Sequence, residues 1–145
     1  MINTCGIFLI TPNWKTLIGK ASRHGPHQLY SIPKGKAEDG EEFLSAALRE
    51  LYEEANVTIN PSNHVIHTLP PIKYERKAKI LNAFFITGIL EEDYPDLICN
   101  SFIPNGSPEL TDLEWRSLFD CKTLLHPTQA RAIESIEEYL LSKKM

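Results

Sequence analysis

The sequence predicts an α/β fold, a sandwich in which a mixed β-sheet lies between two helices. Short apolar runs ended by proline, asparagine or glycine indicate several strands. Two longer segments carry apolar residues at helical spacing, one near the middle of the chain and one near its end. A sheet with one helix for each face gives an α/β/α arrangement. The pattern does not fix the order of the strands.

The first predicted elements are two strands. Cys5–Ile10 and Thr16–Lys20 are apolar runs joined through a Pro-Asn turn, so we expect them to form a hairpin. A polar loop follows over residues 21–28. Pro33 keeps the residue before it extended, so residues 29–35 are predicted to be a strand end or a loop.

The middle of the chain predicts further strands. Residues 57–59 begin an apolar stretch that Asn60-Pro61 stops, and Val65–Leu69 is a second run that ends at two prolines. Ile80–Leu90 is apolar on both faces. We therefore expect it to be the central strand of a covered sheet.

The last third predicts a loop over residues 91–108, a strand that carries Trp115, and a final helix. Trp115 is expected to pack in the core. The helix begins near His126-Pro127-Thr128, because proline suits the first helical turn. Its apolar stripe consists of Ala130, Ile133, Ile136, Leu140 and Leu141.

The helix in the middle of the chain is predicted from Asp39 to Asn56. Asp39, with Glu42 three residues later, forms a capping box. Asn56 follows the last apolar position and tolerates the left-handed conformation that ends helices. The apolar face consists of Phe43, Leu44, Ala47, Leu48, Leu51 and Ala55.

Three glutamates form one patch at the edge of this apolar face. Glu50, Glu53 and Glu54 are spaced so that they repel one another, and Glu54 is expected to point toward protein. Arg49 can reach Glu53 but cannot neutralise all three. A Glu-rich helix is often a solvated face, but a buried acid cluster needs a cation. A hard divalent ion with oxygen ligands fits, and Mg²⁺ is the usual one beside phosphates.

The stretch from Gly35 to Val57 resembles the signature of the Nudix hydrolases. That signature is Gly, five residues, Glu, seven residues, Arg-Glu, an apolar residue, any residue, Glu-Glu, any residue, Gly and an apolar residue. The matching positions here are Gly35, Glu41, Arg49, Glu50, Leu51, Glu53, Glu54 and Val57. Asn56 stands where the family has glycine, and asparagine is the commonest substitute at such a C-cap. We call the helix in this stretch the box helix.

The resemblance implies a Nudix-type sandwich, with the box helix against one face of the sheet and the C-terminal helix against the other. It also implies Mg²⁺-dependent hydrolysis of a nucleoside diphosphate linked to another moiety, with Mn²⁺ as a substitute metal. The implied metal ligands are Gly35, through its carbonyl, and Glu50, Glu53, Glu54 and Glu109.

The resemblance also implies roles for individual residues. Glu109 stands six residues before Trp115, where Nudix proteins often have a further metal ligand, and we prefer it to its neighbour Glu114. Either Glu50 or Glu53 is the general base. Arg49 is expected to orient the glutamates.

Substrate contacts are predicted near the signature. Ile32-Pro33-Lys34-Gly35-Lys36 resembles the Pro-Lys-Gly start of the signature in diadenosine tetraphosphate hydrolases. The predicted substrate-binding residues are Arg23, Lys34, Tyr74, Arg76, Lys77 and Lys79. Arg23 also fits a solvated loop, and residues 73–79 also fit a sheet edge protected by positive charge.

A dinucleoside polyphosphate such as diadenosine tetraphosphate is therefore the first choice of substrate, followed closely by the 5′ end of triphosphorylated RNA. Nucleotide sugars, damaged nucleoside triphosphates and ADP-ribose stay open, and diphosphoinositol polyphosphates would call for more basic residues. The non-enzyme alternative is a nucleotide-binding Nudix module that has lost catalysis. The intact set of acids argues against it.

Composition bounds these expectations. With 145 residues, 42% hydrophobic and 23% charged, the chain fits a single globular domain over residues 1–145. The net charge of −4 argues against nucleic-acid binding by bulk electrostatics. Three scattered cysteines fit a reducing compartment, and neither a secretion signal nor a membrane-spanning run is evident. We expect a cytoplasmic protein without a membrane partner. The sequence does not indicate an oligomeric state.

Overall fold

A computed structural model of the chain describes residues 1–22 and 29–143. Its strands are β1 (Ile2–Leu9), β2 (Lys15–Ala21), β3 (Tyr30–Ser31), β4 (Lys34–Lys36), β5 (Ile66–Thr68), β6 (Ile72–Lys73), β7 (Lys79–Ile86) and β8 (Leu110–Ser117). Its α-helices are α1 (Phe43–Ala55), α2 (Leu118–Leu124) and α3 (Pro127–Lys143), and short 3₁₀ turns cover Pro61–Asn63 and Glu91–Asp93.

The strands of the described residues form two sheets. One has five strands in the order β4-β1-β7-β5, with β6 also paired to β7, and the other has three in the order β3-β2-β8. β1 and β7 run parallel, from Ile2 opposite Lys79 to Leu9 opposite Ile86, while β4, β5 and β6 pair antiparallel. The predicted mixed sheet is therefore confirmed, and β7 is an interior strand as expected.

The predicted hairpin of β1 and β2 is wrong beyond its turn. The Thr11 N–H donates to the Lys15 carbonyl at 2.9 Å, and Ile10 bridges to Thr16. The two strands then separate, because β4 and β7 occupy both edges of β1 and β3 and β8 occupy both edges of β2. The turn thus joins two sheets at one end.

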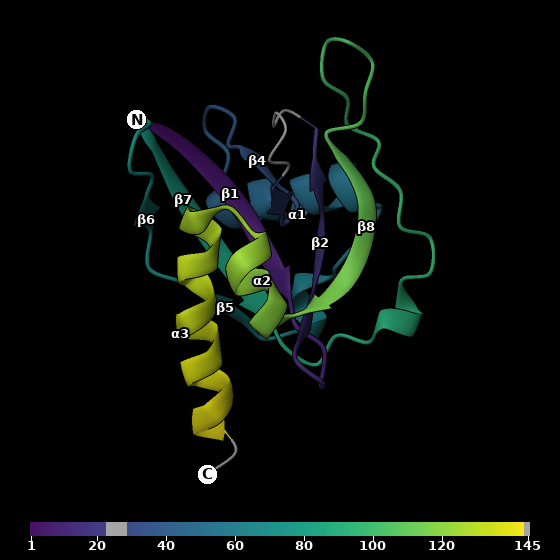
Figure 1. The fold of residues 1–145 in the computed structure, drawn as a ribbon, viewed down its shortest axis with the longest axis vertical. Helices are drawn as coiled ribbons and strands as arrows, with labels where there is room; N and C mark the ends of the chain where they lie inside the picture. Colours follow the sequence, from purple (N-terminus) through teal and green to yellow (C-terminus); the bar gives the residue numbers. More distant parts are fainter. Residues whose placement is uncertain (23–28, 144–145) are drawn as a thin grey trace.

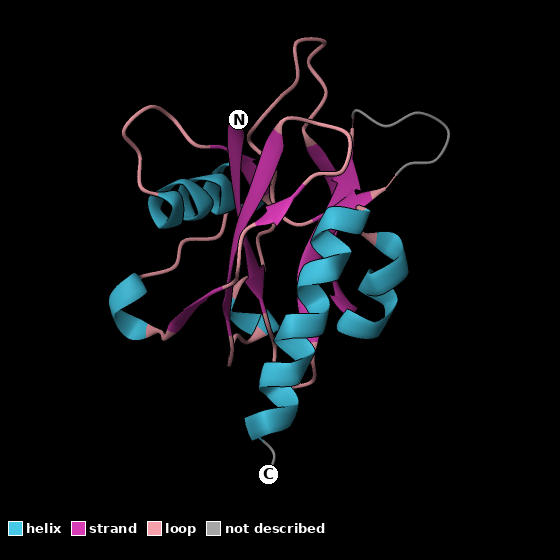
Figure 2. Cartoon of the chain, turned by 90° about the vertical axis from the view of Figure 1, so that its left-hand side faces the viewer, coloured by secondary structure: helices cyan, strands magenta, loops and turns pink. Residues whose placement is uncertain are grey.

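Helices cover both sides of the strands. Figures 1 and 2 show α1 on one side and α2 and α3 on the other. β1 is buried on both faces and contributes to two cores. The core on the α1 side includes Cys5, Ile7, Leu9, Ala47 and Leu51. The core on the α3 side includes Phe8, Ile10, Ala132, Ile133 and Ile136. The predicted α/β/α layering is confirmed.

The box helix, α1, begins later than predicted. Its N-cap is Glu42, which makes no side-chain capping bond. The Glu41 N–H donates to the Glu38 carbonyl at 3.0 Å, and Gly40 has a φ of +77°. The chain therefore completes a turn before the helix starts, and the predicted capping box at Asp39 does not form. The predicted C-cap is confirmed, because Asn56 has a φ of 60° and donates to the Tyr52 carbonyl at 2.9 Å.

Three further details differ from the sequence prediction. Residues 57–59 form no strand, and α2 was not expected; the Ser117 hydroxyl caps α2 by accepting from the Asp120 N–H at 3.1 Å. α3 begins at Pro127 as predicted, but Leu141 is 56% exposed, so its buried stripe ends earlier. No helix in the described ranges is long and apolar enough to cross a membrane.

Candidate active site

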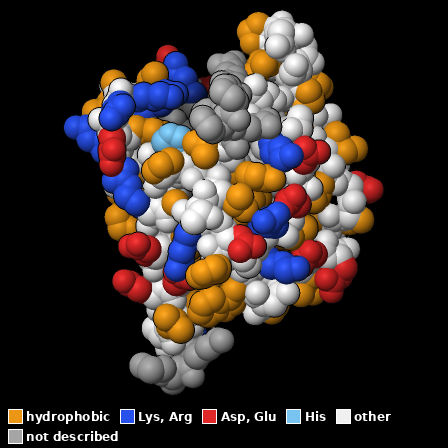
Figure 3. All heavy atoms as spheres, in the orientation of Figure 1, with side chains coloured by type: hydrophobic (Ala, Val, Ile, Leu, Met, Phe, Trp, Pro, Cys, Tyr) orange, Lys and Arg blue, Asp and Glu red, His pale blue; other side chains and the backbone are white. Residues whose placement is uncertain are grey.

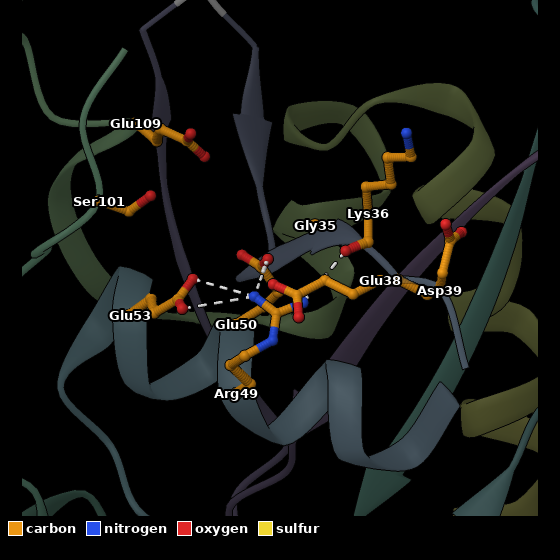
Figure 4. A pocket seen from close by; sticks show the side chains of 10 residues that line it. Gly35, Lys36, Glu38, Asp39, Arg49, Glu50, Glu53, Ser101 and Glu109 are labelled. Carbon is orange, nitrogen blue, oxygen red and sulfur yellow. Dashed lines mark hydrogen bonds and ion pairs between the residues drawn. The ribbon is translucent and has the colours of Figure 1, made fainter. Parts of the chain in front are cut away.

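A cavity of about 510 Å³ lies along α1, between β4 and the start of β8 (Figure 4). It is lined by Gly35, Lys36, Ala37, Glu38, Asp39, Arg49, Glu50, Glu53, Ser101 and Glu109. Five of the predicted catalytic and metal-binding residues therefore border one space. The sixth, Glu54, is buried beside it, with 3% of its surface exposed.

Arg49 is at the centre of the acids. Its Nε and Nη2 donate to the two carboxylate oxygens of Glu41 at 2.8 and 2.9 Å. Its Nη1 donates to Glu50 at 2.9 Å and to Glu53 at 3.2 Å, and its Nη2 also donates to the Lys36 carbonyl at 3.1 Å. Such a planar, forked donor suits several carboxylates at once. Arg49 thus ties the loop before α1 to two glutamates of the helix. Figure 4 shows its bonds to Glu50, Glu53 and the Lys36 carbonyl.

β4 presses directly against these carboxylates. The Lys34 N–H donates to Glu54 Oε1 at 2.9 Å. At Gly35 a Cβ atom would overlap the carboxylate of Glu50. Glycine is therefore required at this position by close approach, and not by an unusual φ.

Glu109 reaches the cavity from the loop that precedes β8. Its N–H donates to the Ser101 carbonyl at 2.7 Å, and the neighbouring Asn100 N–H donates to the Glu53 carbonyl at 2.7 Å. These bonds fasten the loop to α1. Glu114 instead pairs with Arg116 at 2.8 Å on β8. Of the two candidates, only Glu109 lines the cavity.

The carboxyl groups of the site differ in the direction in which their pKa values are shifted. Burial raises the pKa of Glu50, and the nearby charge of Glu53 raises it further. Burial also raises the pKa of Glu54, as does a hydrogen bond with the Glu109 carboxylate. In contrast, the hydrogen bond from Arg49 lowers the pKa of Glu41 to about 2. Glu41 is thus a permanent anion that holds Arg49, while Glu50 and Glu54 ionise reluctantly without a further cation.

The donor chemistry fits a hard divalent cation. Glu50, Glu53, Glu54 and Glu109 offer only oxygen atoms, and two of them, Glu50 and Glu54, are buried carboxyl groups whose ionised form is disfavoured by burial. Within residues 1–22 and 29–143, no three acidic, histidine or cysteine side chains converge on one point as they stand. Arg49 bonds to Glu50 and Glu53 instead. In this arrangement Arg49 balances part of the charge of these two carboxylates.

We predict that Mg²⁺ stabilises the protein more at high pH than at low pH. A carboxyl group with a raised folded-state pKa favours folding below its unfolded pKa of about 4.3, and this contribution is lost as pH rises through the folded pKa. Glu50 and Glu54 both behave in this way in the metal-free protein. Because Mg²⁺ binds the ionised carboxylates, its stabilisation, about 2.7 kcal/mol at a hundredfold excess over Kd, should shrink at low pH.

The measurement is the shift in Tm on adding Mg²⁺ at about pH 8 and about pH 6, with NaCl at matched ionic strength as the control. An equal shift at both pH values would contradict the involvement of these two groups.

The predicted substrate residues border a second region, on the other side of β4. A cavity of about 250 Å³ is lined by Tyr74, Glu75, Arg76, Lys77, His126, Pro127, Thr128 and Arg131. A smaller one next to it, of about 70 Å³, is lined by Ala21, Tyr30, Ser31, Lys34, Tyr74, Lys77, Lys79, His126 and Gln129. We call the two together the basic pocket. Figure 3 shows Lys and Arg side chains gathered over the β6–β7 connection and the start of α3.

The basic pocket includes five of the six predicted substrate residues; Arg23 lies outside the described residues. Tyr74 is less open than expected, because it is only 8% exposed and packs in the core. Its ring lies 5.5 Å from that of His126, centroid to centroid. His126 is therefore the more accessible aromatic side chain of the pair.

Sequence reasoning did not single out several lining residues. Lys36, Glu38 and Asp39 belong to the signature loop, so their position in the motif was an available signal. His126 could have been found as the residue before the proline that starts α3. Ser101 and Gln129 offered no local signal, because tertiary contacts alone bring them to the two cavities.

The chain matches the NUDIX domain family over residues 3–138. It is 25% identical over 141 residues to an RNA pyrophosphohydrolase of Rhizobium meliloti, with 88% of this chain and 82% of that protein covered. An RNA pyrophosphohydrolase of Brucella ovis is 26% identical over 121 residues, which cover 77% and 68% of the two chains.

Solved structures share the fold. The C. elegans Ap4A hydrolase superposes with a TM-score of 0.71 at 21% identity, covering 98% of this chain and 99% of that one. The NUDIX domain of Shewanella oneidensis NrtR, solved with ADP ribose, gives a TM-score of 0.72 at 21% identity, covering 97% and 88%. With the acid cluster, the signature and the family match in agreement, this chain belongs to the Nudix hydrolase family and is a pyrophosphohydrolase.

Proposed function

We propose that residues 1–145 form a single Nudix hydrolase domain that cleaves a dinucleoside polyphosphate such as diadenosine tetraphosphate. The observation that carries the proposal is the position of β4 between the acid-lined cavity and the basic pocket. Gly35 lines the cavity, and Lys34 lines the basic pocket. A nucleotide bound in the basic pocket would place its phosphates near the acids.

Mg²⁺ is the proposed cofactor, with Mn²⁺ as a substitute. The residues that would hold it are Glu50, Glu53, Glu54, Glu109 and the Gly35 carbonyl. When bound, the ion neutralises phosphate oxygens and lowers the pKa of a water molecule. The close contact between Gly35 and Glu50 supports a backbone ligand beside a carboxylate.

The chain's own residues supply the proton transfer and the charge balance. Water adds to one phosphorus, the bridging P–O bond breaks, and the bridging oxygen leaves on the other phosphate. Glu50 or Glu53 takes the proton from the water. Arg49, held by Glu41, keeps a positive charge beside the carboxylates throughout.

Recognition of the nucleotide is assigned to the basic pocket. A base would lie against His126 and the exposed part of Tyr74, and the polyphosphate would meet Lys34, Lys77 and Lys79. Arg76 and Arg131 line the outer part. The free cysteines Cys5, Cys99 and Cys121 fit a reducing cytoplasm, which is the location we propose.

A second candidate is hydrolysis at the 5′ end of triphosphorylated RNA. Two relatives carry that name, and the Lys and Arg side chains that surround the basic pocket could follow a polyanion away from the site. Both candidates use the same acids, so they differ in what occupies the basic pocket.

The test is a substrate panel with Mg²⁺: diadenosine tetraphosphate, triphosphorylated RNA, nucleoside triphosphates, a nucleotide sugar, diphosphoinositol polyphosphate and ADP-ribose. We expect the highest kcat/KM for diadenosine tetraphosphate. Lys77→Gln should raise KM about tenfold with kcat retained, since a charge-assisted hydrogen bond contributes roughly 1.5–3 kcal/mol.

Lys122→Gln is the matched control, because Lys122 pairs with Glu137 at 2.7 Å away from both cavities. Higher kcat/KM for triphosphorylated RNA would replace the first candidate by the second. Binding without turnover of any substrate would indicate a nucleotide-binding module.

A further inference from the structure

The connection between β3 and β4 passes from one sheet to the other. Tyr30 and Ser31 pair with β2, while residues 34–36 pair with β1. Ile32 and Pro33, between them, are buried. Pro33 has no N–H, and Ile32 lies between the two ladders. A buried backbone N–H needs a partner, so this crossover depends on a donor or acceptor from elsewhere.

Gln129, in the first turn of α3, supplies that partner. Its Oε1 accepts from the Ile32 N–H at 2.9 Å, and its Nε2 donates to the Ser31 hydroxyl at 3.0 Å. The Ser31 hydroxyl in turn donates to the Ile32 carbonyl at 2.7 Å. Gln129 is 1% exposed. Gln129, Ser31 and Ile32 thus form a buried hydrogen-bond network at the crossover, which we call the crossover network.

The crossover network lies between the basic pocket and the acid-lined cavity. On one side, His126 and Gln129 line the basic pocket, and the His126 N–H donates to the Tyr30 carbonyl at 3.3 Å. On the other side, two residues past Ile32, the Lys34 N–H holds Glu54 at 2.9 Å. The next residue, Gly35, lies against the Glu50 carboxylate.

We infer that Gln129 is a positioning residue for the metal site. Through Ser31 and Ile32 it fixes the β4 backbone against which Glu54 and Glu50 are oriented, and it couples that backbone to the wall of the basic pocket. This inference rests on the metal site of the proposed function. It assigns Gln129 no contact with substrate or metal.

The test measures Mn²⁺ affinity by electron paramagnetic resonance of the free ion, together with Tm. Gln129→Leu removes both hydrogen bonds, and we expect it to weaken Mn²⁺ binding about tenfold, as loss of an outer-shell partner does. Gln129→Glu keeps an acceptor for the Ile32 N–H and should restore most of the affinity.

Thr11→Val is the matched control. Thr11 is 3% exposed, and its hydroxyl accepts from the Lys15 N–H at 2.9 Å and donates to Asn13 Oδ1 at 2.6 Å. It follows β1, whose pairing with β4 involves Thr4 to Gly6. This variant should lower Tm through the loss of both hydrogen bonds while leaving Mn²⁺ affinity unchanged.

The outcomes are distinct. A lower Tm with wild-type Mn²⁺ affinity in Gln129→Leu would make Gln129 merely structural and overturn the inference. If Gln129→Leu does not fold, the test rests on Ser31→Ala and Gln129→Glu. Weaker Mn²⁺ binding in Ser31→Ala with retained Mn²⁺ binding in Gln129→Glu would support the inference. Unchanged Mn²⁺ binding in both variants would overturn it. A wild-type protein that binds no Mn²⁺ would overturn both the inference and the metal site of the proposed function.

Discussion

Glu53→Gln is expected to lower Mg²⁺-dependent turnover by about 10²–10⁴-fold, the range associated with loss of a general base or acid. The amide keeps the size of the side chain but cannot accept a proton or balance a cation's charge. Arg49 bonds to both candidate bases, to Glu50 at 2.9 Å and to Glu53 at 3.2 Å, but 38% of the Glu53 side chain is exposed whereas Glu50 is buried. Of the two candidates, Glu53 is therefore the one more open to a water molecule.

The measurement is the steady-state rate on the best substrate of the panel, with Glu50→Gln in parallel. Glu42→Gln serves as the control, because it makes the same change at an exposed position at the start of the same helix. Unchanged turnover in Glu53→Gln, together with a large loss in Glu50→Gln, would transfer the role of base to Glu50.

Gly35→Ala is expected to weaken Mn²⁺ binding and turnover by about 10–100-fold, the usual cost of disturbing the support of a metal ligand. The added methyl group would collide with the carboxylate of Glu50, and that carboxylate cannot move freely because Arg49 holds it. Overpacking of this kind also costs about 1–3 kcal/mol of folding free energy.

Gly88→Ala separates steric collision from backbone strain. Gly88 has a φ of +74° with open space where a Cβ would be, so alanine should cost roughly 1–2 kcal/mol through its conformation alone. We expect normal turnover from that variant. Wild-type kinetics in Gly35→Ala would show that β4 does not constrain the carboxylates.

Local patterns were sufficient to predict the box helix and its acid patch. The C-cap at Asn56 and the burial of Glu54 follow from the spacing of apolar residues along one helix. The predicted start of α1 was wrong because Gly40 permits an extra turn before the helix. The capping pattern at Asp39 does not reveal this turn. The parallel pairing of β1 with β7 could not be predicted from the sequence either, because the Pro-Asn turn after β1 favours a hairpin with β2.

The residues of the candidate site likewise include some that the sequence predicts and some that it does not. Gly35, Arg49, Glu50 and Glu53 belong to one continuous motif, so the sequence already places them together. Gln129 reaches the site only because α3 packs beside the crossover between the sheets.

The parallel pairing of β1 with β7 also constrains how the chain folds. Ile2 lies opposite Lys79, and Lys15 on β2 lies opposite Ser117 on β8, so both sheets join segments far apart in sequence. Closing such long loops costs entropy before any contact compensates for it, and chains dominated by distant pairings typically fold in milliseconds to seconds. During synthesis, β1 leaves the ribosome well before β7 exists, so one edge of a strand that is apolar over Cys5–Leu9 stays unpaired until more than half of the polypeptide has emerged.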